Sequence, residues 1–451
     1  MLSHSSFGAD RSTLLHIYRT LIRSKCDYGA AIYSSASRNI LNKLNTIHHT
    51  ALRLATGAFR TSPITSLLYE SEEWSLDLRR ERIILDLLAH LGSSPNTPAY
   101  TLLSENPELL KNFHFLAIAN TLLKSMNTYL PPVFQETPSI IPPWQHFSID
   151  INYSMLDIHK SSANDIYKGA FIQLISKYPN HIHIFTDGSK FNNYVGCAIT
   201  CDKIEDTLIS LPSFHSILSA ELHAIKQAVL QANNLEKKSV ILTDSLNALK
   251  CLQKYHDHKQ HPIAKEIISV LLMTPSSYIN FAWLPSHRGI TGNEKADELA
   301  KQAATLLPTP NLPSTPTDLK THYNSLLSQK WLKNWERVPN SNKFRTVKST
   351  TEFWSTTCQT SRREEVALCR LRIGHARITH AHLFTKSPPP LCQTCSIPLT
   401  VHHLLIDCPT YKNQRLQFNL PPTIQSLLSN NQTTIINLLN FLKSSKLLSE
   451  I

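Results

Sequence analysis

The sequence lacks any long apolar run. No uninterrupted apolar stretch approaches the ~18 residues that a membrane-spanning helix needs, so no transmembrane helix is expected. The first residues, MLSHSSFGADRST, also lack the apolar core of a secretory signal. We therefore expect an intracellular protein, and the sequence leaves the choice between nucleus and cytoplasm open.

Acidic residues are also scarce, and the cysteines show no pattern typical of disulfide bonds. The nine cysteines are odd in number and mostly scattered, which argues against a disulfide framework. The 33 Asp and Glu residues are outnumbered by 45 Lys and Arg, so the formal net charge is +12 although only 17% of the residues are charged. This balance favours a polyanionic partner. Nucleic acid is the first candidate, and an anionic membrane surface is the competing one.

Length and proline placement indicate several domains. A chain of 451 residues is too long for one core, and its 26 prolines gather between apparent domains. We predict a helical region over 1–128, a Pro-rich linker with a short helix over 129–178, an α/β domain over 179–305, a second Pro-rich linker over 306–320, a basic helical region over 321–387, a cysteine-rich segment over 388–412 and a helical tail over 413–451.

Acidic residues within 179–305 follow segments that look buried. The alternating apolar residues of HIHIF predict a strand that ends at Thr186–Ser189, with Asp187 at its end. A second β-branched run, SVILT, ends at Asp244. Helical spacing places Glu221 in the first turn of an amphipathic helix, and Asn293 is expected to be the N-cap of a helix that carries Asp297.

Two strand-end aspartates and two helical acids could converge on one point. Four carboxylates packed together repel one another and need a cation, and hard oxygen ligands suit Mg²⁺ or Mn²⁺. Two such ions can activate a water and stabilise the leaving oxygen in phosphodiester hydrolysis. Any single acid of this kind would be interpreted as a solvated carboxylate or a turn former, so the hypothesis depends on the whole set.

The motifs TDGS, SAEL, TDS and WLPSHRGITGNEKADELAK occur in this order within 181–304. This ordered set resembles the type-1 ribonuclease H family. The resemblance implies that the metal-binding acids are Asp187, Glu221, Asp244 and Asp297, with two Mg²⁺ (or Mn²⁺) ions as the cofactor. The implied activity is hydrolysis of the RNA strand of an RNA–DNA hybrid, in which the 2′-hydroxyl distinguishes RNA from DNA.

The resemblance also concerns a loop histidine and the fold. His287 matches the mobile-loop histidine of the family, which implies a role in leaving-group departure or product release. An exposed histidine without a role is the alternative. The predicted element order is β-β-β-α-β-α-β-α, which gives an α/β fold with a mixed five-stranded sheet and helices on its faces.

Residues 11–125 are predicted to be helical. One predicted helix has an apolar face with basic side chains interspersed, formed by Ile40, Leu44, Ile47, Ala51 and Leu54. SKCDYGAAIY and LNTIHHTALRLATGAFRTSP resemble the segment that follows the polymerase active site in non-LTR retrotransposon polyproteins. The Tyr/Phe-x-Asp-Asp motif of a polymerase is missing, so we expect no DNA synthesis by this chain. An unrelated helical bundle is the alternative.

The region after the second linker extends this resemblance. LCRLRIGHARITH resembles a recurrent segment of the same polyproteins, and its Arg370, Arg372 and Arg377 could meet phosphates or lie on an exposed helical surface. The expected partners are nucleic acid, above all an RNA–DNA hybrid, and the remaining polymerase part of a retroelement. No membrane partner is expected.

Cysteines and a histidine form a compact pattern near the C-terminus. Cys392, Cys395, His403 and Cys408 follow the spacing C-x2-C-x7-H-x4-C, and His402 is the near alternative to His403. Three thiolates and one imidazole suit tetrahedral Zn²⁺, and four protein ligands would make the site closed and structural. The pattern looks like the terminal knuckle of these polyproteins. Reduced, buried cysteines are the alternative.

These features together favour a fragment of a non-LTR retrotransposon polyprotein with ribonuclease H activity, used to remove template RNA after reverse transcription. A catalytically silent remnant that only binds nucleic acid is the alternative. A DNA-directed transposase or integrase is disfavoured, because the motifs TDGS, SAEL and GNEKADELAK resemble ribonuclease H, whereas those families use differently spaced acids.

Overall fold

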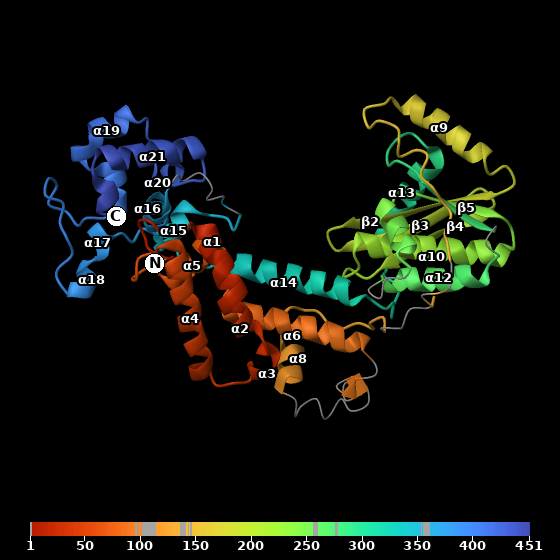
Figure 1. The fold of residues 1–451 in the computed structure, drawn as a ribbon, viewed down its shortest axis with the longest axis horizontal. Helices are drawn as coiled ribbons and strands as arrows, with labels where there is room; N and C mark the ends of the chain where they lie inside the picture. Colours follow the sequence, from red (N-terminus) through yellow and green to blue (C-terminus); the bar gives the residue numbers. More distant parts are fainter. Residues whose placement is uncertain are drawn as a thin grey trace. The chain divides into compact units, whose positions relative to one another are not determined.

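The computed structural model describes residues 2–94, 97–98, 100–101, 114–135, 141–142, 144, 147–255, 260–275, 278–352, 354 and 361–451 (Figure 1). The predicted linker over 129–178 is therefore described only in part. Two compact units are present, one of Met1–Ile84 with Ser325–Ile451 and one of Leu85–Asn324. Among the helices described, none has the length and apolar content to cross a membrane.

A mixed sheet organises the unit of Leu85–Asn324. Its strands lie in the order β1-β6-β5-β2-β3-β4, in which β2, β3 and β4 are antiparallel while β5, β6 and β1 extend the sheet in parallel. The strands are β1 (Ile151–Asn152), β2 (Ile182–Phe191), β3 (Tyr194–Cys201), β4 (Ile204–Leu211), β5 (Ser239–Thr243) and β6 (Ile279–Trp283).

The predicted α/β fold with a mixed sheet is confirmed, but the sheet has six strands rather than five. The strand that sequence reasoning missed is β1. With two residues, it is too short to show the alternation by which a strand is recognised, and it pairs with β6 at the sheet edge.

Helices cover both faces of this sheet (Figure 1). Neighbouring residues of β5 show the two faces, because Ile241 belongs to one buried cluster while Val240 and Leu242 belong to another. The first cluster packs against α10, α11 and α12, and the second against α9. The helices of this unit include α8 (His114–Ser125), α9 (Asn164–Ser176), α10 (Ile217–Leu235), α11 (Leu246–Gln253), α12 (Pro262–Met273) and α13 (Thr291–Ala304).

The other unit is helical. Its N-terminal part holds α1 (Arg11–Ile17), η1 (Tyr18–Arg23), α2 (Ser24–Asp27), α3 (Ala30–Tyr33), α4 (Arg38–Thr56) and α5 (Ile64–Ser71). Its C-terminal part holds α15 (Lys343–Val347), α16 (Arg362–Ile373), α17 (Arg377–His380), α18 (His382–Thr385), η3 (His403–Asp407), η4 (Pro409–Tyr411), α19 (Lys412–Gln417), α20 (Ile424–Leu427), α21 (Gln432–Ser444) and η5 (Leu447–Ser449). Two further helices, α6 (Leu76–Ser93) and α14 (Pro316–Glu336), contain the points where the chain passes from one unit to the other.

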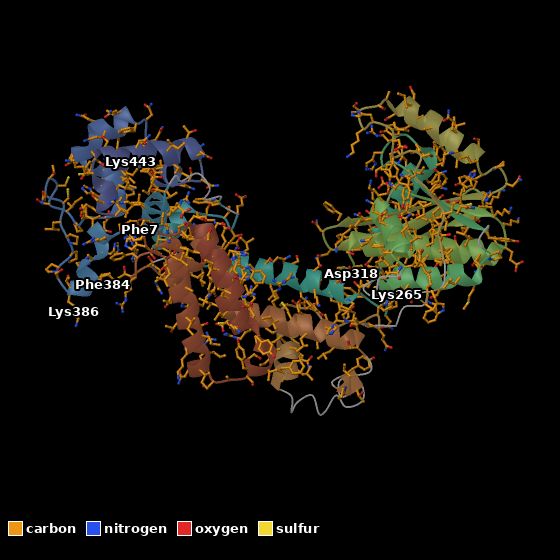
Figure 2. The ribbon with its side chains drawn as sticks, in the orientation of Figure 1. Phe7, Lys265, Asp318, Phe384, Lys386 and Lys443 are labelled. Carbon is orange, nitrogen blue, oxygen red and sulfur yellow. The ribbon has the colours of Figure 1, made fainter. Side chains whose placement is uncertain are left out.

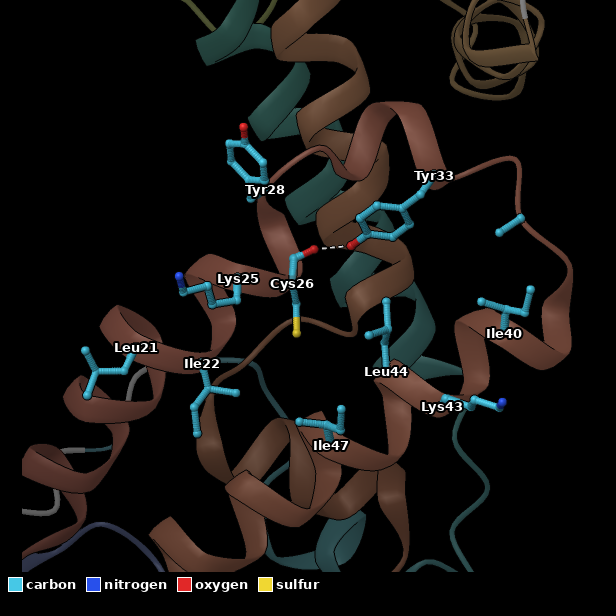
Figure 3. Close-up of a pocket in the computed structure, with 11 residues that line it drawn as sticks. Leu21, Ile22, Lys25, Cys26, Tyr28, Tyr33, Ile40, Lys43, Leu44 and Ile47 are labelled. Carbon is cyan, nitrogen blue, oxygen red and sulfur yellow. Dashed lines mark hydrogen bonds between the residues drawn. The ribbon is translucent and has the colours of Figure 1, made fainter.

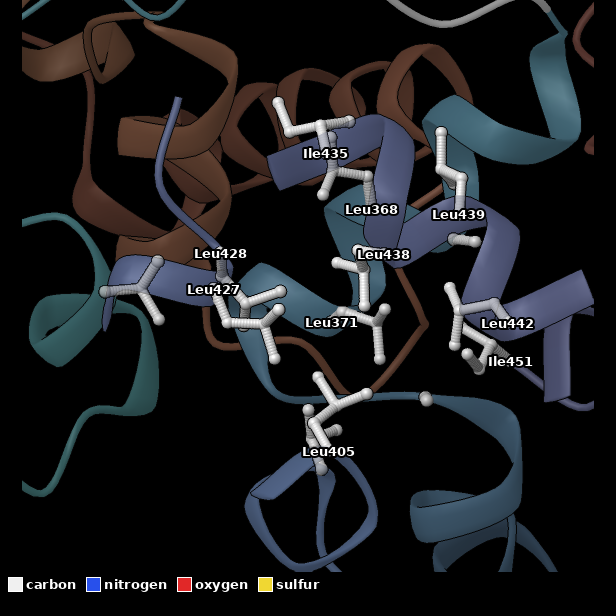
Figure 4. Packing of buried hydrophobic residues seen from close by; sticks show 14 of the residues in the cluster. Leu368, Leu371, Leu405, Leu427, Leu428, Ile435, Leu438, Leu439, Leu442 and Ile451 are labelled. Carbon is white, nitrogen blue, oxygen red and sulfur yellow. The ribbon is translucent and has the colours of Figure 1, made fainter. Parts of the chain in front are cut away.

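Residues from both ends of the chain share the cores of the helical unit. Cys369 and Ile373 of α16 join a buried cluster with Leu15 and Leu52 of the N-terminal helices. A second cluster gathers side chains of α16, α20 and α21, several of which are shown in Figure 4, together with Tyr69 of α5. The predicted segment limits remain predictions, but the sequence did not indicate that these distant segments fold together.

Two of the arginines considered for phosphate binding are engaged inside this unit. Arg372 is buried and donates from Nε to the carbonyl of Leu428 and from Nη2 to that of Ser429. Arg370 donates to the carbonyls of Gly57 and Ile451. Arg370 and Arg372 therefore bind backbone carbonyls of this unit, and neither lies on a fully solvated surface or is free for phosphate as the two predictions supposed. Arg377 is exposed.

Replacing Arg372 tests this structural role. Arg372→Ala leaves the carbonyls at the end of α20 without their donor and creates a cavity, which should lower the free energy of unfolding by about 2 kcal/mol or more. Urea unfolding followed by tryptophan fluorescence measures the change. Arg377→Ala is the matched control and should shift stability by less than about 0.5 kcal/mol. Equal effects of the two substitutions would contradict the role given to Arg372.

Candidate active site and cysteine-rich site

Parallel pairing of β2 with β5 brings two aspartates together. The pairing ends at Thr186 and Thr243, and Asp187 and Asp244 are the next residues on each strand path. The prediction that this strand ends at Thr186–Ser189 is wrong, since β2 continues to Phe191. The physical reason is the antiparallel ladder with β3, which goes on pairing β2 after β5 has ended. Asp187 is thus a strand residue beside the end of the neighbouring strand.

Helix α10 delivers Glu221 to the same place. Ser216 is the N-cap, and Glu221 lies beyond the first turn rather than in it as predicted. Asp318 of α14, labelled in Figure 2, accepts hydrogen bonds from the backbone N–H of Ser216 (3.1 Å) and from Ser219 Oγ (2.6 Å). The start of α10 is therefore held both by its own cap and by a buried carboxylate.

Gly188 permits the close approach of β2 and α10. A Cβ atom at this position would lie 2.7 Å from the backbone nitrogen of Glu221 and 3.0 Å from Cβ of Ala220. The first contact is with backbone, which cannot rotate away, so any other residue would push α10 off the sheet. The glycine of the TDGS motif thus sets the separation between Asp187 and Glu221.

Three carboxylates meet where these elements converge. Asp187, Glu221 and Asp244 each offer an oxygen, and these oxygens lie within 4.8 Å of one another. Asp187 and Glu221 are buried, and Oε2 of Glu221 has no hydrogen-bond partner among the described residues. A buried anionic oxygen without a donor is costly, so this arrangement fits a cation.

Electrostatics support the same conclusion. Burial, followed by the negative charges of Asp244 and Asp297, raises the pKa of Asp187 to about 8. Burial and the charges of Asp187 and Asp244 also raise the pKa of Glu221 well above its ordinary value. The group resists carrying its full negative charge unless a cation is present. Clustered oxygen donors suit Mg²⁺ or Mn²⁺ rather than a softer metal.

The structure does not bring the other two predicted residues into this group. Asp297 on α13 forms an ion pair with Lys301 (2.6 Å), although its charge contributes to the raised pKa of Asp187. His287 is exposed in the loop between β6 and α13 and has a left-handed backbone, with φ of 53°. Its neighbour Arg288 lies over the ring of Tyr167, with 4.7 Å from Cζ to the ring centroid.

Asn293 and Trp283, to which the sequence analysis gave no role at the acidic group, hold Asp244 in place. Asn293 is not the N-cap of α13, a position that Ile290 occupies; it lies inside the helix and donates from Nδ2 to Oδ2 of Asp244 (3.3 Å). Trp283 donates from Nε1 to the carbonyl of Asp244 (3.0 Å). The sequence did contain a sign that Asn293 lies near the acidic group, because Asn293 and Asp297 are spaced i, i+4 and so share one face of a helix.

The cysteine-rich segment forms a second compact group. Cys392 and Cys395 lie on a tight turn in which the N–H of Cys392 donates to Ile397 O and that of Ser396 to Cys392 O, both at 2.8 Å. His403 begins η3 and Cys408 follows it. The four ligand atoms lie within 4.8 Å of one another, and the Sγ atoms of Cys392 and Cys408 are 3.8 Å apart. A zinc tetrahedron with Zn–S bonds of about 2.3 Å has sulfur–sulfur edges of about 3.8 Å.

The two candidate histidines have different environments. His403 is buried with the thiols, and neither of its ring nitrogens has a hydrogen-bond partner among the described residues. His402 is exposed and contacts Asp407, with 2.9 Å from Nδ1 to Oδ2. The adjacent imidazole of His403, with nearby backbone N–H groups, lowers the pKa of Cys392 to about 6, which favours a thiolate. The group therefore fits Zn²⁺ with His403 as the ligand.

The raised pKa values predict how stability depends on pH. Between the ordinary value of 3.8 and about 8, the folded state retains a proton on Asp187 that the unfolded chain has lost. Metal-free protein should therefore become less stable as the pH rises through this window. Urea midpoints of the Leu85–Asn324 unit, measured in chelator at pH 5 and pH 8, check this. Asp187→Asn should reduce the dependence and raise the midpoint at pH 8, and a wild-type midpoint that is unchanged between the two pH values would contradict the assignment.

The cysteine-rich group makes a separate prediction. The full chain, purified under reducing conditions, should carry about one zinc per molecule by elemental analysis. His403→Ala should lose the zinc and lower the unfolding temperature of the helical unit, because Val401 and Leu405 beside the site belong to its core. The matched control is His402→Ala, which should keep both. Zinc retained by His403→Ala and lost from His402→Ala would reverse the ligand assignment.

Comparison with known families agrees with this geometry. Residues 179–305 match the model of the RNase H family, and this range includes the sheet from β2 to β6, the three clustered acids, His287 and Asp297. This part of the chain is an RNase H domain, built on a mixed sheet with helices on both faces.

Proposed function

We propose that this protein hydrolyses the RNA strand of RNA–DNA hybrids in a reaction that depends on divalent metal ions. The observation that supports the proposal best is the buried group of Asp187, Glu221 and Asp244 within a range that matches the RNase H family. The net charge of +12 suits a polyanionic substrate. Contacts to the 2′-hydroxyl would distinguish RNA from DNA.

Each acidic residue has a defined task in this proposal. Asp187, Glu221 and Asp244 would hold the divalent ions, and Asp297 would complete the second site on leaving Lys301. When bound, Mg²⁺ or Mn²⁺ supplies Lewis-acid activation of water and stabilises charge on the leaving oxygen. Asn293 keeps the Asp244 carboxylate oriented toward the group through its 3.3 Å hydrogen bond.

His287 is proposed to assist the departure of the leaving group or the release of product. It is exposed in the loop that precedes α13, where its imidazole can exchange protons with solvent and with a bound strand. The next residue of this loop, Arg288, donates to the carbonyl of Lys160 (2.6 Å). The loop is thus attached to the domain beside a residue free to contact substrate.

The biological setting that we propose is removal of template RNA after reverse transcription by a non-LTR retrotransposon. The motifs in 24–63 and 368–380 support this setting, and the polymerase part of such an element is the proposed protein partner. In the same proposal, zinc at the cysteine-rich group has a structural role.

One observation favours the catalytically silent alternative. Asp297 is held by Lys301 at 2.6 Å and does not belong to the group of three clustered acids. A chain in which this ion pair persists would bind hybrid without completing the second metal site. Tight binding of hybrid by folded protein, with no cleavage in Mg²⁺ or Mn²⁺, would favour this alternative.

A gel assay tests the enzymatic proposal. Full-length protein is incubated with an RNA–DNA hybrid labelled on its RNA strand, with Mg²⁺ or with chelator, beside duplex DNA and duplex RNA. We expect metal-dependent cleavage of the RNA strand of the hybrid alone. Asp187→Asn should reduce the rate by about a thousandfold or more, since a metal site contributes several kcal/mol to transition-state stabilisation.

The matched control is Asp202→Asn, an exposed aspartate in the turn between β3 and β4, which should cleave at the wild-type rate. Undiminished cleavage by Asp187→Asn would overturn the site assignment. Cutting of duplex DNA by the wild-type protein would indicate a DNA-directed nuclease instead.

A further inference from the structure

Helix α4 of the helical unit has two apolar faces, and only one of them is covered. Leu41, Leu52 and Ala55 on the first face are buried. The second face is the stripe predicted from the sequence, and its residues Ile40, Ile47 and Leu54 are 55%, 48% and 51% exposed. At these three positions the stripe therefore faces outward, whereas Ala51 of the same stripe packs against the buried cluster of Leu15 and Leu52.

This exposed stripe forms one wall of a groove (Figure 3). Leu21 and Ile22 of η1 form the opposite wall, and Tyr33 and Cys26 close one end, where the Tyr33 hydroxyl donates to the Cys26 carbonyl. The hollow has a volume of about 730 Å³. Ile22 and Ile47 also line a second hollow of about 280 Å³ that extends toward Leu54. We call the two hollows together the α4 groove.

The spacing of the stripe fits a helix as the occupant. Ile40, Leu44, Ile47, Ala51 and Leu54 alternate steps of four and three residues, which is the pattern of a helix seam that receives side chains of a second helix. Scattered exposed apolar residues are normal, whereas a continuous apolar groove marks an interaction site. Because the surface is concave, it suits an inserted helix better than a flat membrane surface.

Charge around the groove selects the kind of helix. Helix α4 contains Arg38, Lys43 and Arg53 and no acidic residue. Lys25 and Lys43 line the groove, and neither forms an ion pair with any residue in the described part of the chain. On the facing wall, Arg19 and Arg23 are both engaged in ion pairs.

Both arginines pair with the same carboxylate, that of Glu73, at 2.5 Å from Arg19 and 2.6 Å from Arg23. Asp27, the acid that follows the groove residue Cys26, is itself paired with Arg79. The uncompensated charge beside the groove is therefore positive. A second copy of the same surface would bring lysines against lysines, whereas an acidic partner would be complementary.

We propose that the α4 groove binds an amphipathic α-helix of another protein, with apolar residues along one face and Asp or Glu beside that face. Its apolar side chains would enter the hollows on either side of Ile22 and Ile47. Its carboxylates would meet Lys25 and Lys43 at the rim. This interaction site lies in the helical unit and is independent of the proposed nuclease function.

Fluorescence anisotropy with two synthetic helical peptides tests the proposal. Both peptides are about 20 residues long, roughly 30 Å as a helix, with the same Leu stripe. One has Glu beside the stripe and the other has Lys. The full chain should bind the Glu peptide at least about tenfold more tightly than the Lys peptide, a difference of about 1.4 kcal/mol.

Variants of the chain locate the binding. Ile47→Glu places a charge in the groove on an exposed side chain, so folding should be kept while affinity for the Glu peptide falls by about tenfold or more. Ile436→Glu is the matched control, since Ile436 is 45% exposed on α21 outside the groove, and it should bind like wild type. Circular dichroism confirms that both variants are folded.

A charge reversal distinguishes recognition of the peptide's charge from a general effect on folding, because only recognition would change which peptide is preferred. Lys25→Glu combined with Lys43→Glu should transfer the preference from the Glu peptide to the Lys peptide. Absence of binding to either peptide at micromolar concentration would overturn the proposal. So would an Ile47-dependent association with phosphatidylserine vesicles in place of peptide, or an Ile47-dependent dimer in sedimentation, which would assign the groove to a membrane or to a second copy.

Discussion

The mutual repulsion of Asp187, Glu221 and Asp244 is the constraint around which the RNase H domain is arranged. Two neighbouring parallel strands and a helix deliver three acids to one small volume. Gly188 lets the helix come close, and hydrogen bonds from Asn293 and Trp283 keep Asp244 in position. The domain thus maintains a group that is electrostatically unfavourable when fully charged and that protonation or a bound cation relieves. Such stored repulsion is typical of a site built to bind and use metal ions.

The sequence predicted the parts of this site that local patterns encode. Apolar alternation and helical spacing located the strands and helices that carry Asp187, Glu221 and Asp244, and the structure brings these three acids together. The extent of β2 could not be predicted, because it depends on pairing with β3 rather than on its own residues. The partner of Asn293 was also missed, since it lies 49 positions away in the chain and is reached only through the fold.

Long-range pairing also explains what the sequence did not indicate in the helical unit. The charges of Arg370 and Arg372 looked available for phosphate, but their guanidinium groups satisfy backbone carbonyls of segments far along the chain. The spacing of Cys392, Cys395, His403 and Cys408 was informative because one short segment contains the whole group. The stripe of α4 was recognised correctly as apolar, yet the pattern alone could not show which apolar face the rest of the chain covers.

The discontinuity of the helical unit has a consequence for the order in which the protein is made. Leu15 and Leu52 share a buried cluster with Cys369 and Ile373, so the N-terminal helices cannot complete their core until synthesis has passed α16. The RNase H domain between them is finished earlier and has its own core. The apolar surface of the newly made N-terminal helices therefore remains exposed while an entire domain is synthesised. Both ends of that domain finally lead into one folded body, which tethers it at two points rather than one.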